Sequence, residues 1–133
     1  IYLWDNGVKT LLAGSGDTGS RAENAVFMEL LRNNMTCGYY AESEREVDFV
    51  TGINANPLPV EVKYLDRFEW QDKRYSGIRL FLNRFPSVKQ ALVITKNVET
   101  TVTANNIVIH TIPLWKFLLD APAVFSDLPA GNQ

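Results

Sequence analysis

The sequence contains one cysteine, one histidine and no long apolar run, and each of these shortages excludes a class of protein. Because Cys37 has no second cysteine to pair with, the chain forms no internal disulfide and offers no cysteine-based zinc cluster. No apolar run approaches the roughly 20 residues of a membrane-spanning helix, and no signal-peptide pattern opens the chain. We therefore expect a cytoplasmic protein with no membrane segment.

The composition is that of a single globular domain. The chain has 133 residues, of which 46% are hydrophobic and 21% charged, enough for a real core. It starts at Ile1 without a methionine, so we expect it to be a piece of a longer protein. We assign residues 1–20 to a lead-in segment from a preceding domain, 21–120 to the main domain and 121–133 to a weakly ordered tail.

Two segments in the middle of the chain, residues 46–50 and 60–63, alternate polar and apolar residues with a period of two, which is typical of half-buried strands. Turn-forming residues at 51–57 separate them and predict an antiparallel hairpin. If Asp48 lies opposite Glu61, one face carries the charges, including Glu46 opposite Lys63. The other face then carries the apolar residues, which are Val47, Phe49, Val60 and Val62.

The charged face has two interpretations. It can be an ordinary solvated sheet face, where cross-strand pairs contribute roughly 0.2 to 1 kcal/mol. Alternatively, the like charges of Asp48 and Glu61 are held together by a cation, and oxygen-only ligands suit Mg²⁺ or Mn²⁺. Lys63 could then orient an attacking water or offset charge on a phosphate. The second interpretation predicts metal-assisted phosphodiester chemistry.

Glu23 also has two interpretations. Residues 20–23, Ser-Arg-Ala-Glu, fit a capping box, in which the glutamate only closes the first turn of a helix. The same glutamate lies at the margin of that helix's apolar stripe, from which it could lean toward the sheet. The helix is expected to end near residue 31 or 32, and its stripe comprises Ala22, Val26, Phe27, Leu30 and Leu31.

The net charge of −2 conceals a basic middle third. Residues 63–89 carry seven basic residues against three acidic ones, and residues 72–84 are predicted to form a second helix. Its more solvated faces hold Arg74, Arg79 and Arg84, which either contact nucleic-acid phosphates or form a solvated basic surface.

The last third predicts two buried strands, residues 91–95 and 107–110, followed by a helix at 114–119. An earlier strand is expected at 36–41. His110, the only histidine, ends a strand outside the acidic cluster, so we interpret it as structural rather than as a base or a ligand.

Residues 14–19 satisfy the dinucleotide-binding pattern G-x-G-x-x-G, but no further βαβ unit follows them. A phosphate-binding loop would need lysine where Ser20 stands. We interpret the segment as a flexible connection and expect no binding of NAD or FAD.

Several segments together resemble the nuclease-like C-terminal domain of a large group of prokaryotic AAA+ ATPases, and residues 1–7 resemble the segment that leads into it. The matching segments are residues 23–32, 39–40, 46–50, 59–64 and 112–119. The wider superfamily is PD-(D/E)XK, whose motif is a helix glutamate, a strand aspartate and a (D/E)-x-K strand. The resemblance implies an α/β, restriction-endonuclease-like core, with a mixed central sheet flanked by helices in the order αβββαβ.

Carried over to this chain, the motif assigns catalytic roles to Glu23, Asp48, Glu61 and Lys63. Asp48 and Glu61 would hold Mg²⁺ or Mn²⁺, Lys63 would assist the water or the transition state, and Glu23 would hold a metal-coordinated water or a second ion. The resemblance further implies an ATPase domain in the same longer chain. We predict a metal-dependent nuclease domain; the alternative is an inactive nuclease-fold module that binds nucleic acid or protein.

Overall fold

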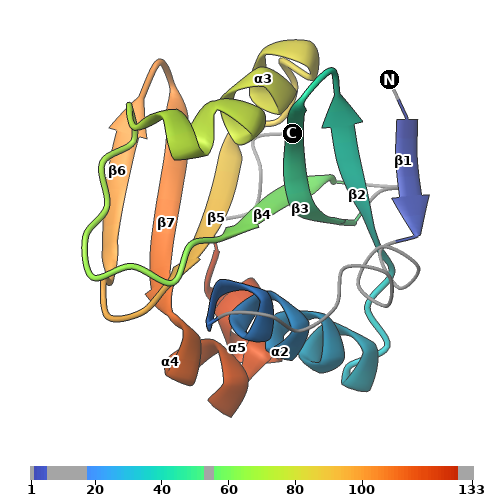
Figure 1. Ribbon diagram of the computed structural model, residues 1–133, viewed down its shortest axis with the longest axis vertical. Helices are drawn as coiled ribbons and strands as arrows, with labels where there is room; N and C mark the ends of the chain where they lie inside the picture. The colour runs from blue at the N-terminus through green and yellow to red at the C-terminus, as the bar shows by residue number, and fades with distance from the viewer. Residues whose placement is uncertain (1, 6–17, 53–55, 129–133) are drawn as a thin grey trace.

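The computed structural model describes residues 2–5, 18–52 and 56–128, which form a mixed sheet flanked by helices (Figure 1). The predicted α/β class and the order αβββαβ are confirmed, from α2 through β2, β3, β4 and α3 to β5. The strands are β1 Tyr2–Asp5, β2 Cys37–Glu42, β3 Arg45–Thr51, β4 Leu58–Val62, β5 Gln90–Thr95, β6 Thr100–Ala104 and β7 Ile107–Pro113. The helices are α2 Thr18–Arg32, the 3₁₀ turn η1 Lys73–Tyr75, α3 Ser76–Arg84, α4 Leu114–Leu119 and α5 Ala121–Asp127.

The seven strands lie in the order β1-β2-β3-β4-β5-β7-β6. From β1 to β4 each strand is antiparallel to the next, so the predicted antiparallel hairpin of β3 and β4 is confirmed. Strands β4, β5 and β7 are parallel, and β6 pairs antiparallel with β7 at the edge. The sheet therefore changes from antiparallel to parallel at β4, the strand that carries Glu61.

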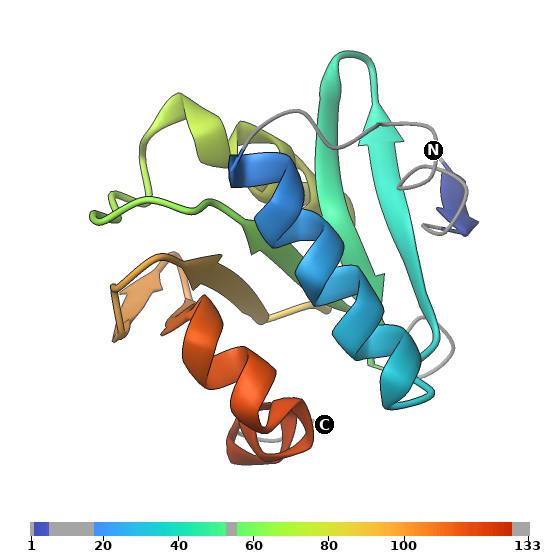
Figure 2. The same cartoon turned by 60° about the horizontal axis from the view of Figure 1, so that its bottom comes forward.

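Helices cover both faces of the sheet. Helix α3 lies over one face, and α2, α4 and α5 lie over the other (Figures 1 and 2). Each face has its own core, with Phe27, Phe49 and Phe117 among the residues on the α2 side and Tyr40, Tyr75 and Phe81 among those on the α3 side. Of the two interpretations of the charged face of the β3–β4 hairpin, the ordinary solvated sheet face is wrong, because residues 47–51 and 59–62 are all buried.

A β-bulge in β3 changes which way its side chains point. Gly38 pairs with Val50 and Tyr40 pairs with Val47, so β3 has one more residue than β2 between these pairs. The expectation that Val47 shares a face with Phe49 is wrong for this reason: Val47 packs in the α3-side core, whereas Phe49 packs in the α2-side core. Asp48 lies within the bulge, a feature that often re-aims a side chain next to a functional site.

Both ends of the main domain extend beyond the predicted limits. Residues 2–5 of the expected lead-in pair with β2 as strand β1. Residues 121–127 of the expected tail form α5, with the Asp120 carboxylate capping the helix by accepting from the Ala123 amide at 3.1 Å. Ala121 is fully buried. Most of the glycine-rich loop, residues 14–17, lies outside the described residues.

Strand β6 is an element that the sequence analysis did not predict. It is short and polar, and the turn to β7 consists of Asn105 and Asn106, both with positive φ (52° and 65°). Two such residues form the type I′ turn that suits a tight hairpin.

Among the described residues no helix has both the length and the apolar character required to cross a bilayer.

Helix α3 approaches β3 so closely that its second residue has to be glycine. A Cβ placed on Gly77 would lie 2.2 Å from the Glu46 carbonyl oxygen. We expect Gly77→Ala to destabilise the protein by about 2 kcal/mol or more, although alanine is the better helix former by roughly 1 kcal/mol. Urea unfolding measures the change. Asn83→Ala on the exposed side of α3 is the control; a Gly77→Ala variant as stable as this control would contradict the close contact.

Candidate functional site

The candidate site lies where β3 and β4 separate. Their last paired residues in this direction are Phe49 and Val60, so Asp48 and Glu61 occupy the next position beyond the ladder. Beyond the ladder, the Val62 amide donates its hydrogen bond to the Asp48 side chain and not to a backbone carbonyl of β3. The distance from the Val62 nitrogen to the Asp48 Oδ2 is 2.8 Å. Asp48 is only 7% exposed. One structural bond therefore fixes this carboxylate against β4.

Glu61 is the most deeply buried acid of the site, with 3% of its surface exposed. Its Oε1 accepts a hydrogen bond from the Lys63 Nζ at 2.5 Å, whereas its buried Oε2 has no hydrogen-bond partner among the described residues. Burial raises the pKa of Glu61 well above its usual range, and the nearby charge of Asp48 raises it further, with Lys63 opposing both. The two carboxylates therefore repel each other in a site of low polarity.

Lys63 follows β4 and is placed by β5, since its backbone amide donates to the Ile94 carbonyl at 2.9 Å. Its side chain is partly buried, which acts to lower its pKa. The negative charges of Glu61, Asp48 and Glu23 outweigh this effect, so the pKa of Lys63 is raised and the ammonium stays protonated at neutral pH. Lys63 is thus a fixed cation rather than a base.

Glu23 reaches the same cluster from the α2 side, because its charge is among those that raise the pKa of Lys63. Helix α2 starts at Thr18, so Ser20 is already helical and does not occupy the N-cap position that the capping-box interpretation requires. The structure therefore brings Asp48 of β3, Glu61 of β4 and Lys63 just after β4 together, and Glu23 of α2 is near enough for its charge to act on Lys63.

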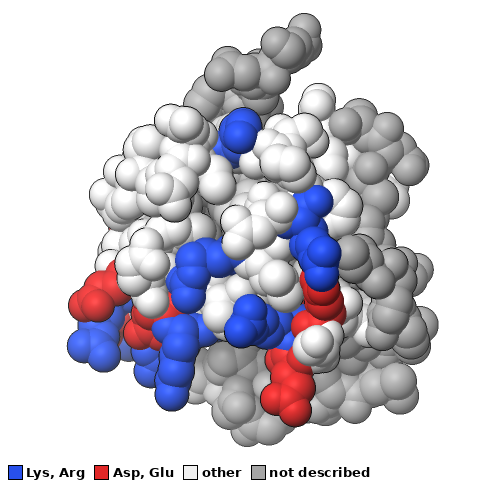
Figure 3. All heavy atoms as spheres, turned by 90° about the horizontal axis from the view of Figure 1, so that it is seen from above, with Lys and Arg blue, Asp and Glu red and all other residues white. Residues whose placement is uncertain are grey.

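The three arginines are placed less favourably for a ligand. Arg79 donates to the carbonyl oxygens of Trp70 and Asp72, and Arg84 forms a two-point pair with Glu42. Arg74 pairs with the Asp72 carboxylate at 2.8 Å and is 44% exposed. Figure 3 looks onto the α3 side of the molecule and shows Lys and Arg side chains interspersed with Asp and Glu rather than one continuous basic patch.

Tyr75 is a neighbour of the cluster that the sequence analysis did not assign to the site. It is 2% exposed and stacks on Trp70 with ring centroids 6.2 Å apart. Burial raises the pKa of Tyr75, and the charges of Lys63 and Glu61 both act on its hydroxyl. A tyrosine within an apolar stripe was the available signal, since a buried hydroxyl normally faces a polar group.

The residues present fit a small, hard divalent cation. Two carboxylates supply only oxygen ligands, and the buried Glu61 Oε2 is free to become one. No three metal-ligating side chains converge within the described part of the chain, but Mg²⁺ commonly takes only one or two carboxylates from the protein. Asp48 and Glu61 are the residues that would hold such an ion.

The fold and the site together define an α/β domain with a buried carboxylate–lysine cluster. The cluster lies at β4, where the pairing of the strands changes from antiparallel to parallel. A sequence model of a domain of unknown function, DUF4143, matches residues 18–117. The match covers most of the chain, which therefore belongs to this family. The domain is known from AAA-ATPase-associated proteins. No curated protein and no solved structure matched the chain.

The repulsion between the two acids leads to a stability prediction. A carboxyl group whose pKa is raised by folding contributes stability below its ordinary pKa, and this contribution is lost as the pH rises toward the folded value. In EDTA, which removes divalent ions, we therefore expect Glu61→Gln to raise the thermal midpoint near pH 7 by about 3 °C or more. This corresponds to a gain of roughly 1 kcal/mol in the free energy of unfolding, and we expect a smaller gain near pH 4.5.

Thermal unfolding at the two pH values measures this effect, with Glu44→Gln in the exposed β2–β3 turn as the control. A lower midpoint for Glu61→Gln at pH 7 would mean that the Glu61–Lys63 pair is a net stabilising contact. That result would favour a structural role for the cluster.

Proposed function

We propose that this domain is a divalent-metal-dependent nuclease that hydrolyses nucleic-acid phosphodiesters, with a restriction-endonuclease-like, PD-(D/E)XK core. We further propose that it is the C-terminal part of a cytoplasmic AAA+ ATPase. The observation that carries the proposal is the burial of Asp48 and Glu61 side by side, with Lys63 bonded to Glu61. Lys63 offsets only part of the repulsion, because the buried Glu61 Oε2 is left without a partner among the described residues, so binding of a further cation would explain why the pair is present.

Each residue has a role that follows from its contacts. Asp48 and Glu61 would hold Mg²⁺ or Mn²⁺, which when bound neutralises phosphate charge and makes water a better nucleophile. The Val62 amide fixes the Asp48 carboxylate, leaving its other oxygen for binding. Lys63, a fixed cation bonded to Glu61, would stabilise the charge that develops on the phosphate. Glu23 would orient a water from the α2 side.

Two further observations support the proposal. The order αβββαβ is the one that the resemblance to this superfamily implies. The family match, to a domain known from AAA-ATPase-associated proteins, agrees with the proposed ATPase context.

A second candidate function is an inactive nuclease-fold module that binds nucleic acid or a partner protein. It is favoured by the direct bond between Lys63 and Glu61, which partly neutralises the acid that would hold the ion. The structural contacts of Arg79 and Arg84 favour the protein-binding form of this module, because they leave fewer arginines for phosphates.

The deciding experiment is a cleavage assay of the chain with Mn²⁺ or Mg²⁺. Single-stranded, duplex and branched DNA and RNA are the substrates, and binding to each is measured at several salt concentrations. Metal-dependent cleavage that Asp48→Asn removes supports the nuclease. Salt-dependent binding without cleavage supports a nucleic-acid module, and neither cleavage nor binding supports a protein partner.

A further inference from the structure

A cavity of about 490 Å³ is lined by residues of β5, β6, β7, α4 and α5. None of Asp48, Glu61 and Lys63 lines it. Its floor is a row across three strands, in which Leu92 pairs with His110 and His110 pairs with Thr101. Its volume falls in the range of small-molecule sites, roughly 300 to 1,000 Å³.

His110 supplies a polar atom that the fold does not use. Its Nε2 is buried and has no hydrogen-bond partner among the described residues. Burial lowers the pKa of His110, so the ring is neutral at pH 7. Depending on its tautomer, the Nε2 can then donate a hydrogen bond to a bound molecule or accept one from it. A buried polar atom without a partner costs free energy, which a ligand with a polar group would recover.

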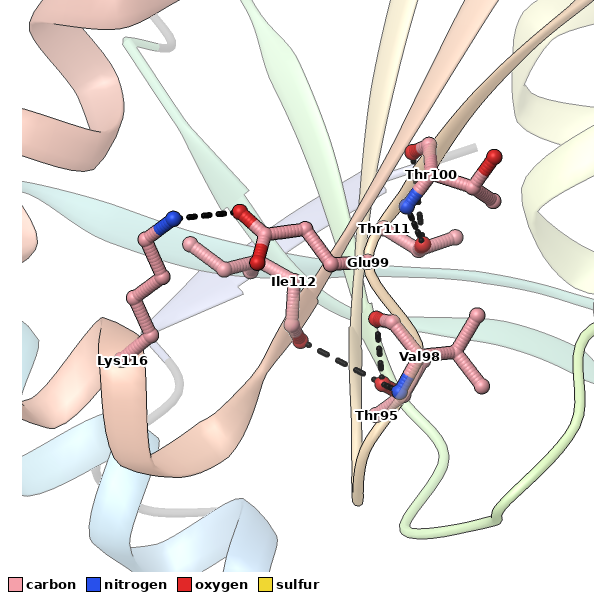
Figure 4. A network of polar contacts seen from close by, with 7 residues as sticks. All are labelled: Thr95, Val98, Glu99, Thr100, Thr111, Ile112 and Lys116. Carbon is pink, nitrogen blue, oxygen red and sulfur yellow. Dashed lines mark hydrogen bonds and ion pairs between the residues drawn. The ribbon is translucent and has the colours of Figure 1, made fainter.

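The walls are apolar on one side and acidic at the mouth. Leu92, Ile112 and Val124 supply apolar surface. The acids at the mouth are Glu99, Asp120 and Asp127, against one base, Lys116, so the charged residues of the lining sum to −2. Lys116 is already paired with Glu99 (Figure 4), and the Asp120 carboxylate caps α5.

Asp127 is therefore the acid left to meet a ligand: it is exposed and makes no ion pair or hydrogen bond with the described residues. The residues on either side of Glu99 are held in place by hydrogen bonds. The Val98 amide donates to the Thr95 hydroxyl, and the Thr100 amide donates to the Thr111 hydroxyl, each at 2.8 Å (Figure 4). These bonds fix the turn that carries Glu99.

We propose that this cavity is a binding site for a small organic amine, an aromatic or branched apolar group that carries a protonated nitrogen. The apolar group would lie against Leu92, Ile112 and Val124, and the cation would face Asp127. A polar atom of the ligand would bond to the His110 Nε2. The acidic mouth disfavours anions of the same shape, so charge rather than size sets the specificity.

The test uses three probes of one shape, each with a phenol hydroxyl available to the His110 Nε2: the amine tyramine, the neutral alcohol tyrosol and the anionic 3-(4-hydroxyphenyl)propionate. Each is titrated to 10 mM into the ¹⁵N-labelled chain at constant pH and ionic strength, and amide shifts are followed by NMR. We expect saturable shifts at Leu92, His110 and Val124, with a Kd for the amine at least about tenfold lower than for the anion. Equal affinities, shifts located elsewhere or no shift with any probe would overturn the proposal.

Two variants locate the binding. Ala123→Phe fills the cavity from an exposed helix position, so the fold is retained, and it should raise the Kd of the amine at least about tenfold. Asp127→Asn should raise it about two- to fivefold and leave the affinity for the alcohol unchanged. Glu44→Gln, distant in the β2–β3 turn, should change neither. An amine affinity unaffected by both cavity variants would also overturn the site.

Discussion

Replacing Lys63 with methionine is expected to lower metal-dependent cleavage at least about 100-fold while nucleic-acid binding stays within severalfold of wild type. The ammonium is expected to act mainly on the charge that develops in the transition state, and a 100-fold loss corresponds to about 2.7 kcal/mol. Single-turnover cleavage with Mn²⁺, beside binding measured in Ca²⁺ or without metal, gives both quantities. Methionine matches the apolar stem of the lysine side chain beside Glu61 and lacks only its ammonium group.

Lys89→Met, at an exposed position outside the cluster, is the matched control and should change neither quantity. Because Lys63→Met leaves the buried Glu61 without its cation, the thermal midpoint of each variant has to be measured as well. Equal losses of binding and cleavage would place Lys63 in ground-state binding instead. If no cleavage exists, Arg74→Ala is the informative variant, since removing one phosphate contact reduces the salt slope by roughly one.

Millimolar Mg²⁺ or Mn²⁺ is expected to raise the thermal midpoint of the wild-type protein, and Asp48→Ala is expected to abolish the increase. Binding to the folded state alone stabilises a protein by about 2.7 kcal/mol at a hundredfold excess of ligand over Kd. The measurement is a thermal-unfolding series at increasing metal concentration. Calorimetric titration of the same variants gives the number of ions bound.

The hydrogen bond from the Val62 amide to Asp48 calls for a second variant. Asp48→Ala removes both the charge and the acceptor, whereas Asp48→Asn keeps an oxygen for the amide and removes only the charge. We expect Asn at this position to lose the metal response while retaining more stability than Ala. Asp66→Ala on the surface should retain the response. A wild-type midpoint that metal does not change would exclude the metal site.

The elements with strong periodicity were predictable from the sequence. The β3–β4 hairpin, its register near Asp48 and Glu61, and a helical segment near 72–84 follow from local alternation and spacing, although residues 73–75 form the 3₁₀ turn η1 and α3 begins only at Ser76. Strand β6 did not follow, because it is short, polar and made stable by its pairing with β7. Helix α5 was missed because Pro122 looks like a helix breaker, although proline is favourable in the first turn behind a capping aspartate.

The candidate site was predictable as a set of residues but not as an environment. Spacing along the chain places Asp48 and Glu61 together, yet their burial depends on α3, which packs on β3 through contacts distant in sequence. The orientation of Val47 depends on a register shift against β2, which β3 alone does not encode. Tyr75 is near the cluster only because the chain, after the loop that follows β4, comes back to the cluster at η1.

The extra residue of β3 makes the length of that strand, and not only its composition, a condition for the arrangement of the candidate site. Side chains alternate between faces with a period of two, so losing one residue between Val47 and Val50 would turn the preceding part of the strand over. A conservative substitution at 45–50 changes one side chain and leaves the directions of the others unchanged, whereas a deletion there would redirect several side chains at once. We therefore expect relatives of this chain to vary in length at the turns on either side of β3 and hardly at all within it.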